Sequence, residues 1–348
     1  MVVIGDRPVA AGIHSELKEA QAVKLVVVLP AHNEEKTIAR VITEIPRAIE
    51  DVTEVEVLVI DDGSTDGTVE EAKKAGADTV ISHTANKGVG AAFSTGKDFA
   101  LRMGADIIVT MDADGQFNPN DIPRLIEHVL RGQADFVTAS RFLDESFKPK
   151  MPRIKRIGNS FFTRIVNLLT GQKLADTQCG FRVYSREAAL RLNTFGDFTY
   201  TQEVLIDLLN KGMNVREVPI KVNEREGKSK VVTHWYSYGL KALVITIRSF
   251  RDHKPLRFFG SISLLALIPG VMIGLFMLGH LAITGRTSPF TSLLYLVVAL
   301  LILGTIFLVL ALIADMLGRL KRIEEELLYY SKLNNYKDNG LRKESSSK

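Results

Sequence analysis

The sequence predicts an α/β protein with a mostly parallel sheet, followed by a transmembrane helical hairpin. Short apolar runs rich in β-branched residues alternate with helical stretches over the first part of the 348 residues. This pattern is typical of parallel strands covered by helices on both faces. Later in the chain, residues 258–283 and 290–314 contain no Asp, Glu, Lys or Arg. Each run is long enough to cross a hydrocarbon core of about 30 Å as a helix.

Composition excludes several other classes. The chain has a single cysteine, Cys179, so it can form neither an internal disulfide nor a cysteine-based metal cage. Its net charge of +4 is too small to indicate nucleic acid as a partner. The first 22 residues lack a long apolar core, so we do not expect a signal peptide.

Strands and helices alternate along the α/β part of the chain. Strands are expected at residues 24–30, 55–61, 78–83, 105–111 and 134–141. Helices are expected from about Glu34 to Ile49, from near Asp66, across residues 88–104 and across residues 118–132. The resulting parts are an N-terminal extension (1–22), an α/β domain (23–232), an amphipathic interface helix (233–257), a transmembrane hairpin (258–316) and a polar tail (317–348). Beyond Lys332 we expect the tail to be disordered, because it is polar.

Basic residues at the outer ends of the hairpin predict its orientation. They are Arg248, Arg251, Lys254 and Arg257 before it, and Arg319, Lys321 and Arg322 after it. The connecting loop carries only Arg286. The positive-inside rule therefore places the α/β domain and both termini in the cytoplasm. A buried hairpin in a soluble protein is the alternative, which two uncharged runs of this length disfavour.

Two amphipathic segments are also candidates for binding a membrane surface. Residues 151–171 would place one apolar stripe on a helix: Ile154, Ile157, Phe161, Ile165 and Leu168. Residues 234–254 repeat the pattern with Leu240, Leu243, Ile247 and Phe250. Basic amphipathic helices with aromatic residues bind membrane surfaces. For the first segment a core-facing helix is an equal alternative, whereas the second leads directly into a span and is expected at the interface.

Polar loops follow three of the expected strands. They read "PAHNEE" (30–35), "DDGSTD" (61–66) and "DADGQ" (112–116). Ligands of parallel α/β sheets bind beyond the carboxyl ends of the strands. In an extended chain Asp112 and Asp114 would point to one side, where like charges repel unless a cation holds them. The pair therefore indicates a metal site, a phosphatase-type nucleophile or a helix N-cap.

The alternatives to a metal site explain less. An N-cap accounts for one such loop but not for three. A phosphatase needs a general acid and a hydroxyl near its nucleophile, where this loop has Gly115 and Gln116. "GVG" in residues 88–90 lacks the third glycine of a dinucleotide fingerprint. Oxygen ligands from Asp114 and Gln116 suit a hard cation such as Mg²⁺ or Mn²⁺ that carries substrate phosphates.

Seven motifs in order carry a resemblance to a known family. They are "VVVLPAHNEE", "VLVIDDGSTDGT", "NKGVGAA", "MDADGQF", "ADFVTASR", "DTQCGFRVYSRE" and "VREVPIKVNEREGKSK". The set resembles family 2 glycosyltransferases of the GT-A fold, which is Rossmann-like with a mostly parallel sheet. Within that family it is similar to the polyprenyl-phosphate branch typified by dolichyl-phosphate mannose synthases. The resemblance covers roughly residues 24–235.

The resemblance implies roles for particular residues. Nucleotide-sugar binding falls to Pro30, Ala31, His32, Glu34, Ile60, Asp62, Asp112, Ala113 and Asp114. Metal ligands would be Asp112, Asp114 and Gln116. Catalytic residues would be Asp112, Asp114, Arg141, Arg225 and Lys230. Candidates for the acceptor phosphate are Arg141, Gln178, Arg182, Arg225, Lys228 and Lys230. Two positions depart from the family: His32 replaces a common tyrosine, and Arg225 lies unusually close to Gly227.

The resemblance also implies a reaction. One sugar, mannose or glucose, would move with inversion from a nucleotide diphosphate sugar to dolichyl or polyprenyl phosphate at a bilayer, with Mg²⁺ or Mn²⁺ as cofactor. The Gln-x-x-Arg-Trp motif of processive synthases is missing, which favours a single transfer. Alternatives are a UDP-N-acetylhexosamine donor, a lipid acceptor without phosphate, and an inactive nucleotide-sugar-binding scaffold.

Overall fold

The structure, a computed structural model, describes residues 22–149, 153–193, 200–223, 251 and 255–346. Seven strands form one sheet in the order β3-β2-β1-β4-β6-β5-β7. Their bounds are β1 (Lys24–Ala31), β2 (Glu54–Asp61), β3 (Thr79–Ser82), β4 (Ile107–Thr110), β5 (Phe136–Ser140), β6 (Arg182–Ser185) and β7 (Val215–Pro219). Only β6 among them runs antiparallel, to both β4 and β5. The predicted α/β class with a mostly parallel sheet is confirmed.

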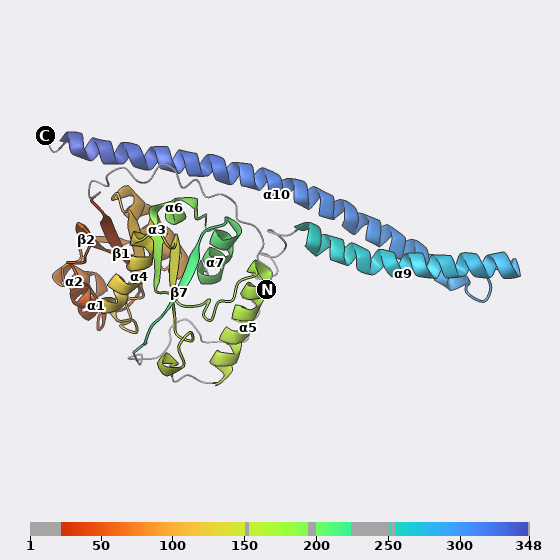
Figure 1. Ribbon diagram of the computed structural model, residues 1–348, viewed down its shortest axis with the longest axis horizontal. Coiled ribbons are helices and arrows are strands. Elements are labelled where there is room, and N and C mark those ends of the chain that lie inside the picture. Colours follow the sequence, from red (N-terminus) through yellow and green to blue (C-terminus); the bar gives the residue numbers. More distant parts are fainter. Residues whose placement is uncertain (1–21, 150–152, 194–199, 224–250, 252–254, 347–348) are drawn as a thin grey trace.

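Helices cover both faces of the sheet (Figure 1). They are α1 (Ile38–Glu44), α2 (Thr68–Lys74), α3 (Val89–Arg102), α4 (Ile122–Leu130), α5 (Arg153–Thr170), α6 (Arg186–Arg191) and α7 (Tyr200–Asn210), with 3₁₀ turns η1 (Pro119–Asp121) and η2 (Glu145–Phe147). α1 is shorter than expected. It begins after a turn in which Glu34 O accepts the N–H of Thr37 (3.0 Å). It ends at Glu44 because Pro46 disfavours helical geometry at Ile45, whose ψ is 121°.

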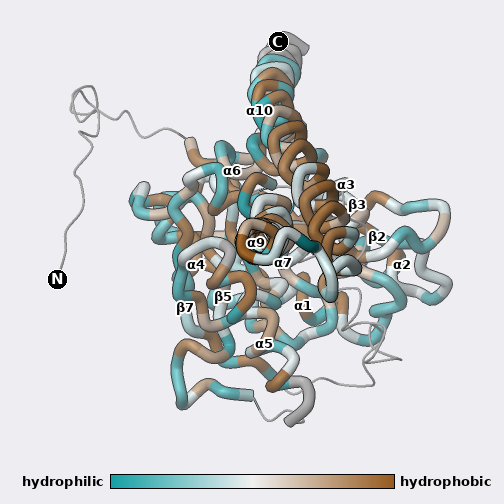
Figure 2. The backbone as a smooth tube through the Cα atoms, turned by 90° about the vertical axis from the view of Figure 1, so that its right-hand side faces the viewer, coloured by the Kyte–Doolittle hydropathy of each residue, from teal (hydrophilic) through white to brown (hydrophobic). Residues whose placement is uncertain are grey.

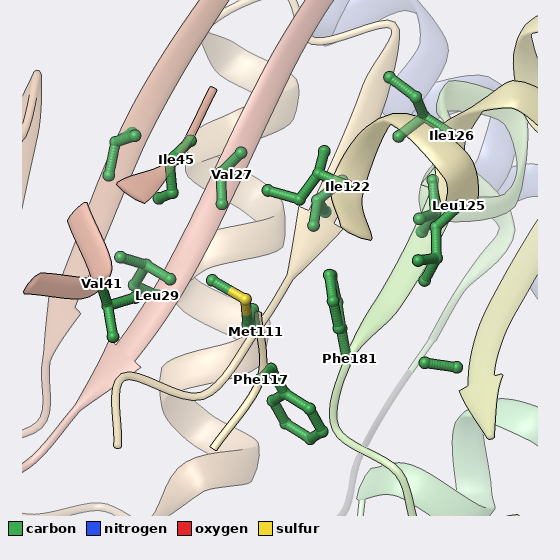
Figure 3. Close-up of a cluster of buried hydrophobic side chains, with 14 of the residues drawn as sticks. Val27, Leu29, Val41, Ile45, Met111, Phe117, Ile122, Leu125, Ile126 and Phe181 are labelled. Atoms are coloured by element: carbon green, nitrogen blue, oxygen red, sulfur yellow. The ribbon is translucent and has the colours of Figure 1, made fainter. Parts of the chain in front are cut away.

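The central strand β1 is buried on both faces. Leu25, Val27 and Leu29 pack against α1 and α4, whereas Val26 and Val28 pack against α3. Figure 3 shows part of the first of these clusters, with Met111, Phe117 and Phe181 beside the strand that carries Val27 and Leu29. This core fixes the carboxyl ends of β1 and β4 beside each other, because the two strands pair directly.

The apolar runs form two long helices, α9 (Pro255–Thr284) and α10 (Thr291–Ser346), that project together from the α/β domain (Figure 1). Both are long and apolar enough to cross a membrane. Their apolar side chains are largely exposed: Leu265 is 77% and Ile283 is 87% exposed. The alternative of a hairpin buried in a soluble core is therefore wrong for these helices.

The expected disorder beyond Lys332 is wrong. α10 continues to Ser346 and passes back along α3 and α6 (Figure 1). Tyr329, Leu333 and Tyr336, spaced as one face of a helix, pack against the core cluster of those helices. Lys332 Nζ donates to Asn193 Oδ1 (2.7 Å) and to the carbonyl oxygens of Leu190 (3.4 Å) and Leu192 (3.3 Å). Burial lowers the pKa of Lys332 to about 8.

This docking predicts that α10 stabilises the α/β domain. Leu333→Asp is expected to lower the free energy of unfolding by about 1–3 kcal/mol, because it places an unpaired carboxylate against an apolar cluster. Leu327→Asp is the matched control, since Leu327 is 66% exposed on the same helix. Thermal unfolding of the two full-length variants measures the difference. Equal melting temperatures would show that α10 contributes nothing to the stability of the domain.

Candidate active site

The loops after β1 and β2 are tied together by hydrogen bonds. Asn33 adopts a positive φ of 55°, and its N–H donates to Ser64 Oγ (2.9 Å). In return Asn33 Oδ1 accepts the N–H of Thr65 (2.8 Å). Glu34 N–H donates to Thr68 Oγ1 (2.8 Å), which also anchors the first turn of α2. The predicted nucleotide loop at residues 30–34 is therefore held rigidly beside the "DDGSTD" loop.

Asp62 connects the second loop to the third. It is buried, and its carboxylate accepts the N–H groups of Lys87 (2.9 Å) and Gly88 (2.7 Å). The same carboxylate pairs with His83 Nδ1 (2.8 Å), and His83 Nε2 lies 3.0 Å from Thr95 Oγ1. Asp62 thus positions the loop at Lys87 and Gly88. The sequence had predicted only nucleotide-sugar binding for this residue. Ile60, predicted at the nucleotide site, is fully buried in the α3 side of the core instead.

The "DADGQ" loop is a turn rather than extended chain. β4 ends at Thr110, and Gly115 has a φ of +73°. The extended conformation predicted for Asp112 to Asp114 is therefore wrong. Asp114 is 9% exposed, and its Oδ1 accepts the N–H of Gln116 (3.1 Å).

Neighbouring elements hold this loop from both sides. Thr37 Oγ1 donates to Ala113 O (2.8 Å), and the N–H of Asn223 donates to Gln116 O (2.8 Å). Two glycines leave room for charged side chains. A Cβ at Gly180 would lie 2.9 Å from Asp112 Oδ2, and a Cβ at Gly115 would collide with the guanidinium of Arg40. Arg40 and Gly180 therefore border the acidic loop, although the sequence analysis assigned them no role.

Arg141 is held by a carboxylate that the sequence analysis missed. Its Nε and Nη2 donate to the two oxygens of Asp176 (2.7 and 3.0 Å), which is fully buried. Burial lowers the pKa of Arg141, but the ion pair with Asp176 outweighs burial, so the pKa is raised. Glu217 in turn accepts the N–H of Asp176 (2.8 Å), and burial raises the pKa of Glu217. The Arg141 guanidinium, a predicted ligand of the acceptor phosphate, thus already binds Asp176 with two of its nitrogen atoms. The Arg141 side chain is 22% exposed.

The other acceptor candidates divide into three groups. Arg182 is fully buried on β6 and donates from Nε to Cys179 O (2.8 Å), so it is a structural side chain and not an accessible phosphate ligand. Burial raises the pKa of Cys179 to about 12, so its thiol stays protonated at neutral pH. Gln178 Nε2 is buried and has no hydrogen-bond partner among the described residues, which leaves a donor for a ligand. Arg225, Lys228 and Lys230 lie outside the described residues.

Helix α5 exposes three residues of its predicted apolar stripe. Ile157, Phe161 and Leu168 are 68%, 51% and 82% exposed. The side chains that α5 buries are others: Asn159, Phe162, Thr163 and Val166. The core-facing alternative is therefore wrong for these three residues. Figure 2 looks onto the face of the domain from which α9 emerges, and α5 lies on that face.

A basic cavity of about 330 Å³ lies between α5 and the loop after β5. Phe142, which follows Arg141, lines it together with the cationic side chains of Lys148, Arg156 and Arg164. Arg156 and Arg164 are exposed and form no ion pair with any described residue. Asn159, which also lines the cavity, has a buried Oδ1 without a partner in the described part of the chain. The arrangement suits an anion presented next to an apolar surface.

The acidic loop fits a hard cation by the chemistry of its donors. Asp112, Asp114 and Gln116 supply oxygen atoms within five residues of one turn. Across the residues that the structure describes, no three His, Cys, Asp or Glu side chains come together as a metal cluster. The described residues thus offer too few carboxylates for a closed cage. A cation there would need ligands from a bound diphosphate, which is how Mg²⁺ commonly binds.

Comparison with known sequences identifies the family. Residues 26–192 match the family model described as glycosyl transferase family 2. An uncharacterized protein of Methanocaldococcus jannaschii is 36% identical over 213 residues, covering 60% of this chain and 85% of that protein. UDP-N-acetylglucosamine–dolichyl-phosphate N-acetylglucosaminyltransferase of Methanococcus voltae is 34% identical, covering 57% of this chain and 84% of that enzyme. Polyprenol monophosphomannose synthase of Mycolicibacterium smegmatis is 31% identical, covering 66% of this chain and 89% of that enzyme.

Comparison with solved structures agrees on the fold. Glucosyl-3-phosphoglycerate synthase from Mycobacterium tuberculosis, in complex with Mn²⁺, UDP and phosphoglyceric acid, superposes with a TM-score of 0.51 at 23% identity. The match covers 66% of this chain and 78% of that chain. The sequence motifs, the sheet topology and these relatives indicate the same family and fold. The chain belongs to glycosyl transferase family 2 and is a glycosyltransferase of the GT-A fold.

Proposed function

We propose that the protein transfers one sugar from a nucleotide diphosphate sugar to a polyprenyl phosphate at a membrane surface. The observation that carries this proposal is the position of α5. This helix carries exposed apolar side chains and lines the basic cavity, and it lies on the side of the domain from which the apolar hairpin projects (Figure 2). A lipid phosphate needs both features, because its chain stays in the bilayer while its charged group must reach the enzyme.

The donor is proposed to bind at the loops that follow β1, β2 and β4. Pro30, Ala31, His32 and Glu34 would border the nucleotide, and Asp62 would position the loop at Lys87 beside it. Asp112, Asp114 and Gln116 would hold Mg²⁺ or Mn²⁺. The M. tuberculosis enzyme has been crystallised with either ion and UDP, which supports a divalent cation here. When bound, the cation neutralises the diphosphate and makes it a better leaving group.

The acceptor is proposed to place its phosphate near Arg141, between the acidic loop and the α5 cavity. Arg156, Arg164 and the buried Gln178 amide are the described candidates for further contacts. Arg225, Lys228 and Lys230 stay candidates from the sequence alone. The second ionisation of a phosphate monoester lies near pH 6, so the acceptor is mostly dianionic at neutral pH. It is already a nucleophile and needs no strong general base. Its direct attack on the anomeric carbon would invert the configuration.

The membrane placement rests on the two apolar helices. Because α10 returns to pack on α6, the chain after the second run must lie on the same side of the membrane as the α/β domain. A hairpin that crosses twice satisfies this requirement. The basic residues at its outer ends support a cytoplasmic side for the domain and both termini. The interface helix proposed at residues 233–257 lies mostly outside the described residues.

Mannose or glucose remains the proposed sugar, with N-acetylglucosamine as the alternative. The relatives include a polyprenol monophosphomannose synthase, a dolichyl-phosphate hexose transferase and an N-acetylglucosaminyltransferase. The test is to incubate the purified full-length protein with polyprenyl phosphate and labelled GDP-mannose, UDP-glucose or UDP-N-acetylglucosamine. We expect one glycolipid from one donor. Nucleotide binding without any product would instead favour the inactive scaffold.

The α5 stripe yields a further prediction. The double variant Ile157→Ser/Phe161→Ser is expected to raise the KM for a long-chain acceptor about tenfold, because two apolar contacts with lipid are lost. Its KM for the nucleotide sugar should stay unchanged, since the stripe lies outside the donor loops. Leu327→Ser, on the exposed face of α10, is the matched control. An equal effect on long and short acceptors would show that the stripe does not engage lipid.

A further inference from the structure

A second cavity, which we name the junction cavity, lies where the hairpin meets the α/β domain. Its volume is about 660 Å³. Its walls come from α6 and α7 of the domain, from the first residues of α9, and from α10 between Asp315 and Tyr329. The uncharged run of α9 begins at residue 258 and that of α10 ends at residue 314. The cavity therefore opens where both helices would leave the hydrocarbon core.

The junction cavity contains more positive than negative charge. Its cationic side chains are Arg191, Lys211, Arg257, Arg319, Lys321 and Arg322. Its acidic side chains are Asp207, Asp315, Glu325 and Glu326.

Four of the cations are paired within the cavity. Lys211 pairs with Asp207 (2.7 Å), and Arg319 pairs with Asp315 (2.7 Å). Arg191 pairs with Glu326 (3.2 Å), and Lys321 lies 3.8 Å from Glu325.

Arg257 and Arg322 remain without a carboxylate partner in the described part of the chain. Both are exposed, and they come from different helices. Arg257 directly precedes the apolar run of α9. Arg322 follows residue 314 by eight positions, or about 12 Å along a helix. The headgroup layer extends about 5–8 Å beyond the hydrocarbon core, so a long arginine side chain at either position can reach it.

We infer that the junction cavity binds the phosphate of an anionic phospholipid from the leaflet on the side of the α/β domain. This inference rests on the proposed insertion of the hairpin in a membrane. Guanidinium groups match phosphate oxygens in a planar fork, and two unpaired ones leave the cavity with an uncompensated charge. Pro255 and Leu256 line the same cavity and offer apolar surface to the glycerol and upper acyl chains. The site is separate from the α5 cavity proposed for the acceptor.

A bound phospholipid would join three parts of the molecule. The cavity walls belong to the domain, to the first span and to the docked part of α10, so one ligand contacts all three. Lipid binding would therefore fix the hairpin relative to α5 and hold the acceptor cavity at a constant height above the bilayer. Anionic lipid should accordingly stabilise the whole protein and not the hairpin alone.

The test uses the full-length protein in nanodiscs of phosphatidylcholine with increasing phosphatidylglycerol, with retained lipid measured by native mass spectrometry. The wild type is expected to retain phosphatidylglycerol, and Arg257→Gln/Arg322→Gln to lose about tenfold in affinity, because each surface arginine adds to the attraction for anionic lipid. Arg257→Lys/Arg322→Lys should bind at an intermediate level, since the charge remains without the fork. Arg286→Gln is the matched control, because Arg286 lies in the loop at the far end of the hairpin.

Each outcome separates the alternatives. Equal retention of phosphatidylglycerol by the wild type and the double glutamine variant would overturn the inference. It would also be overturned if inorganic phosphate protected the wild type from thermal unfolding as well as phosphatidylglycerol does. Nucleotide binding by the variant checks that it is folded. Failure of the protein to insert into nanodiscs would overturn the inference together with the proposed membrane placement. Normal lipid retention without any sugar transfer would support the lipid site and count only against the proposed reaction.

Discussion

Asp114→Ala is expected to lower turnover about a thousandfold or more, because the proposed cation would lose an anionic ligand and would no longer stabilise the leaving diphosphate by several kcal/mol. Excess chelator should have the same effect on the wild type, and Mg²⁺ or Mn²⁺ should restore it. The measurement is initial rate of glycolipid formation at saturating donor and acceptor.

The matched control for this prediction is Asp144→Ala. Asp144 is a half-buried loop aspartate outside the "DADGQ" loop, and its Oδ1 accepts the N–H of Ser146 (2.8 Å) at the start of the 3₁₀ turn η2. Its turnover should stay near that of the wild type. Full activity of the wild type in excess chelator would contradict the assignment of the "DADGQ" loop to a cation.

Gly180→Ala is expected to lower activity about 10- to 100-fold while leaving the melting temperature almost unchanged. The added Cβ would lie 2.9 Å from Asp112 Oδ2 and 3.1 Å from Oδ1, so the carboxylate must move. A carboxylate end can move at little cost in stability, whereas groups that orient metal ligands commonly affect metal affinity by this factor. The readouts are the metal concentration at half-maximal rate and the thermal unfolding curve.

Gly279→Ala serves as the control for adding a methyl group, because a Cβ there meets no atom within 4 Å. Higher metal concentrations should partly rescue Gly180→Ala but should not affect Gly279→Ala. If Gly180→Ala unfolds at a much lower temperature than the wild type, the glycine serves packing. If it keeps full activity, Asp112 does not need its present position.

The α/β core could be predicted because its strands are buried on both faces. Such strands must be continuous apolar runs, and β1 and β2 were expected within one residue of their observed bounds. The antiparallel β6 was not expected. Its place between β4 and β5 depends on pairing between distant segments, which no local pattern encodes. The same strand explains the burial of Arg182, because β6 lies inside the sheet and consecutive residues on both of its faces are buried.

The position of the candidate site in the fold could be predicted, but the arrangement of its side chains could not. Polar loops at the carboxyl ends of strands located it, since parallel strands bring those ends together. The partner of Arg141 could not be read, because Asp176 is 35 residues away and buried by long-range packing. The docking of α10 had a local signal in Tyr329, Leu333 and Tyr336. That spacing alone does not predict docking, because it does not show which surface the three side chains pack against, here that of α3 and α6.

The most direct test of the account compares two acceptors that differ only in the phosphate. Polyprenyl phosphate and the free polyprenol of the same chain length are each incubated with the full-length protein, a divalent cation and the nucleotide sugar that supports transfer. Mass spectrometry then measures the glycolipid formed. We expect a product only from the phosphate, with one sugar added and an inverted anomeric configuration. Equal transfer to the free polyprenol, or a product with retained configuration, would contradict the proposal that the acceptor phosphate itself attacks the donor.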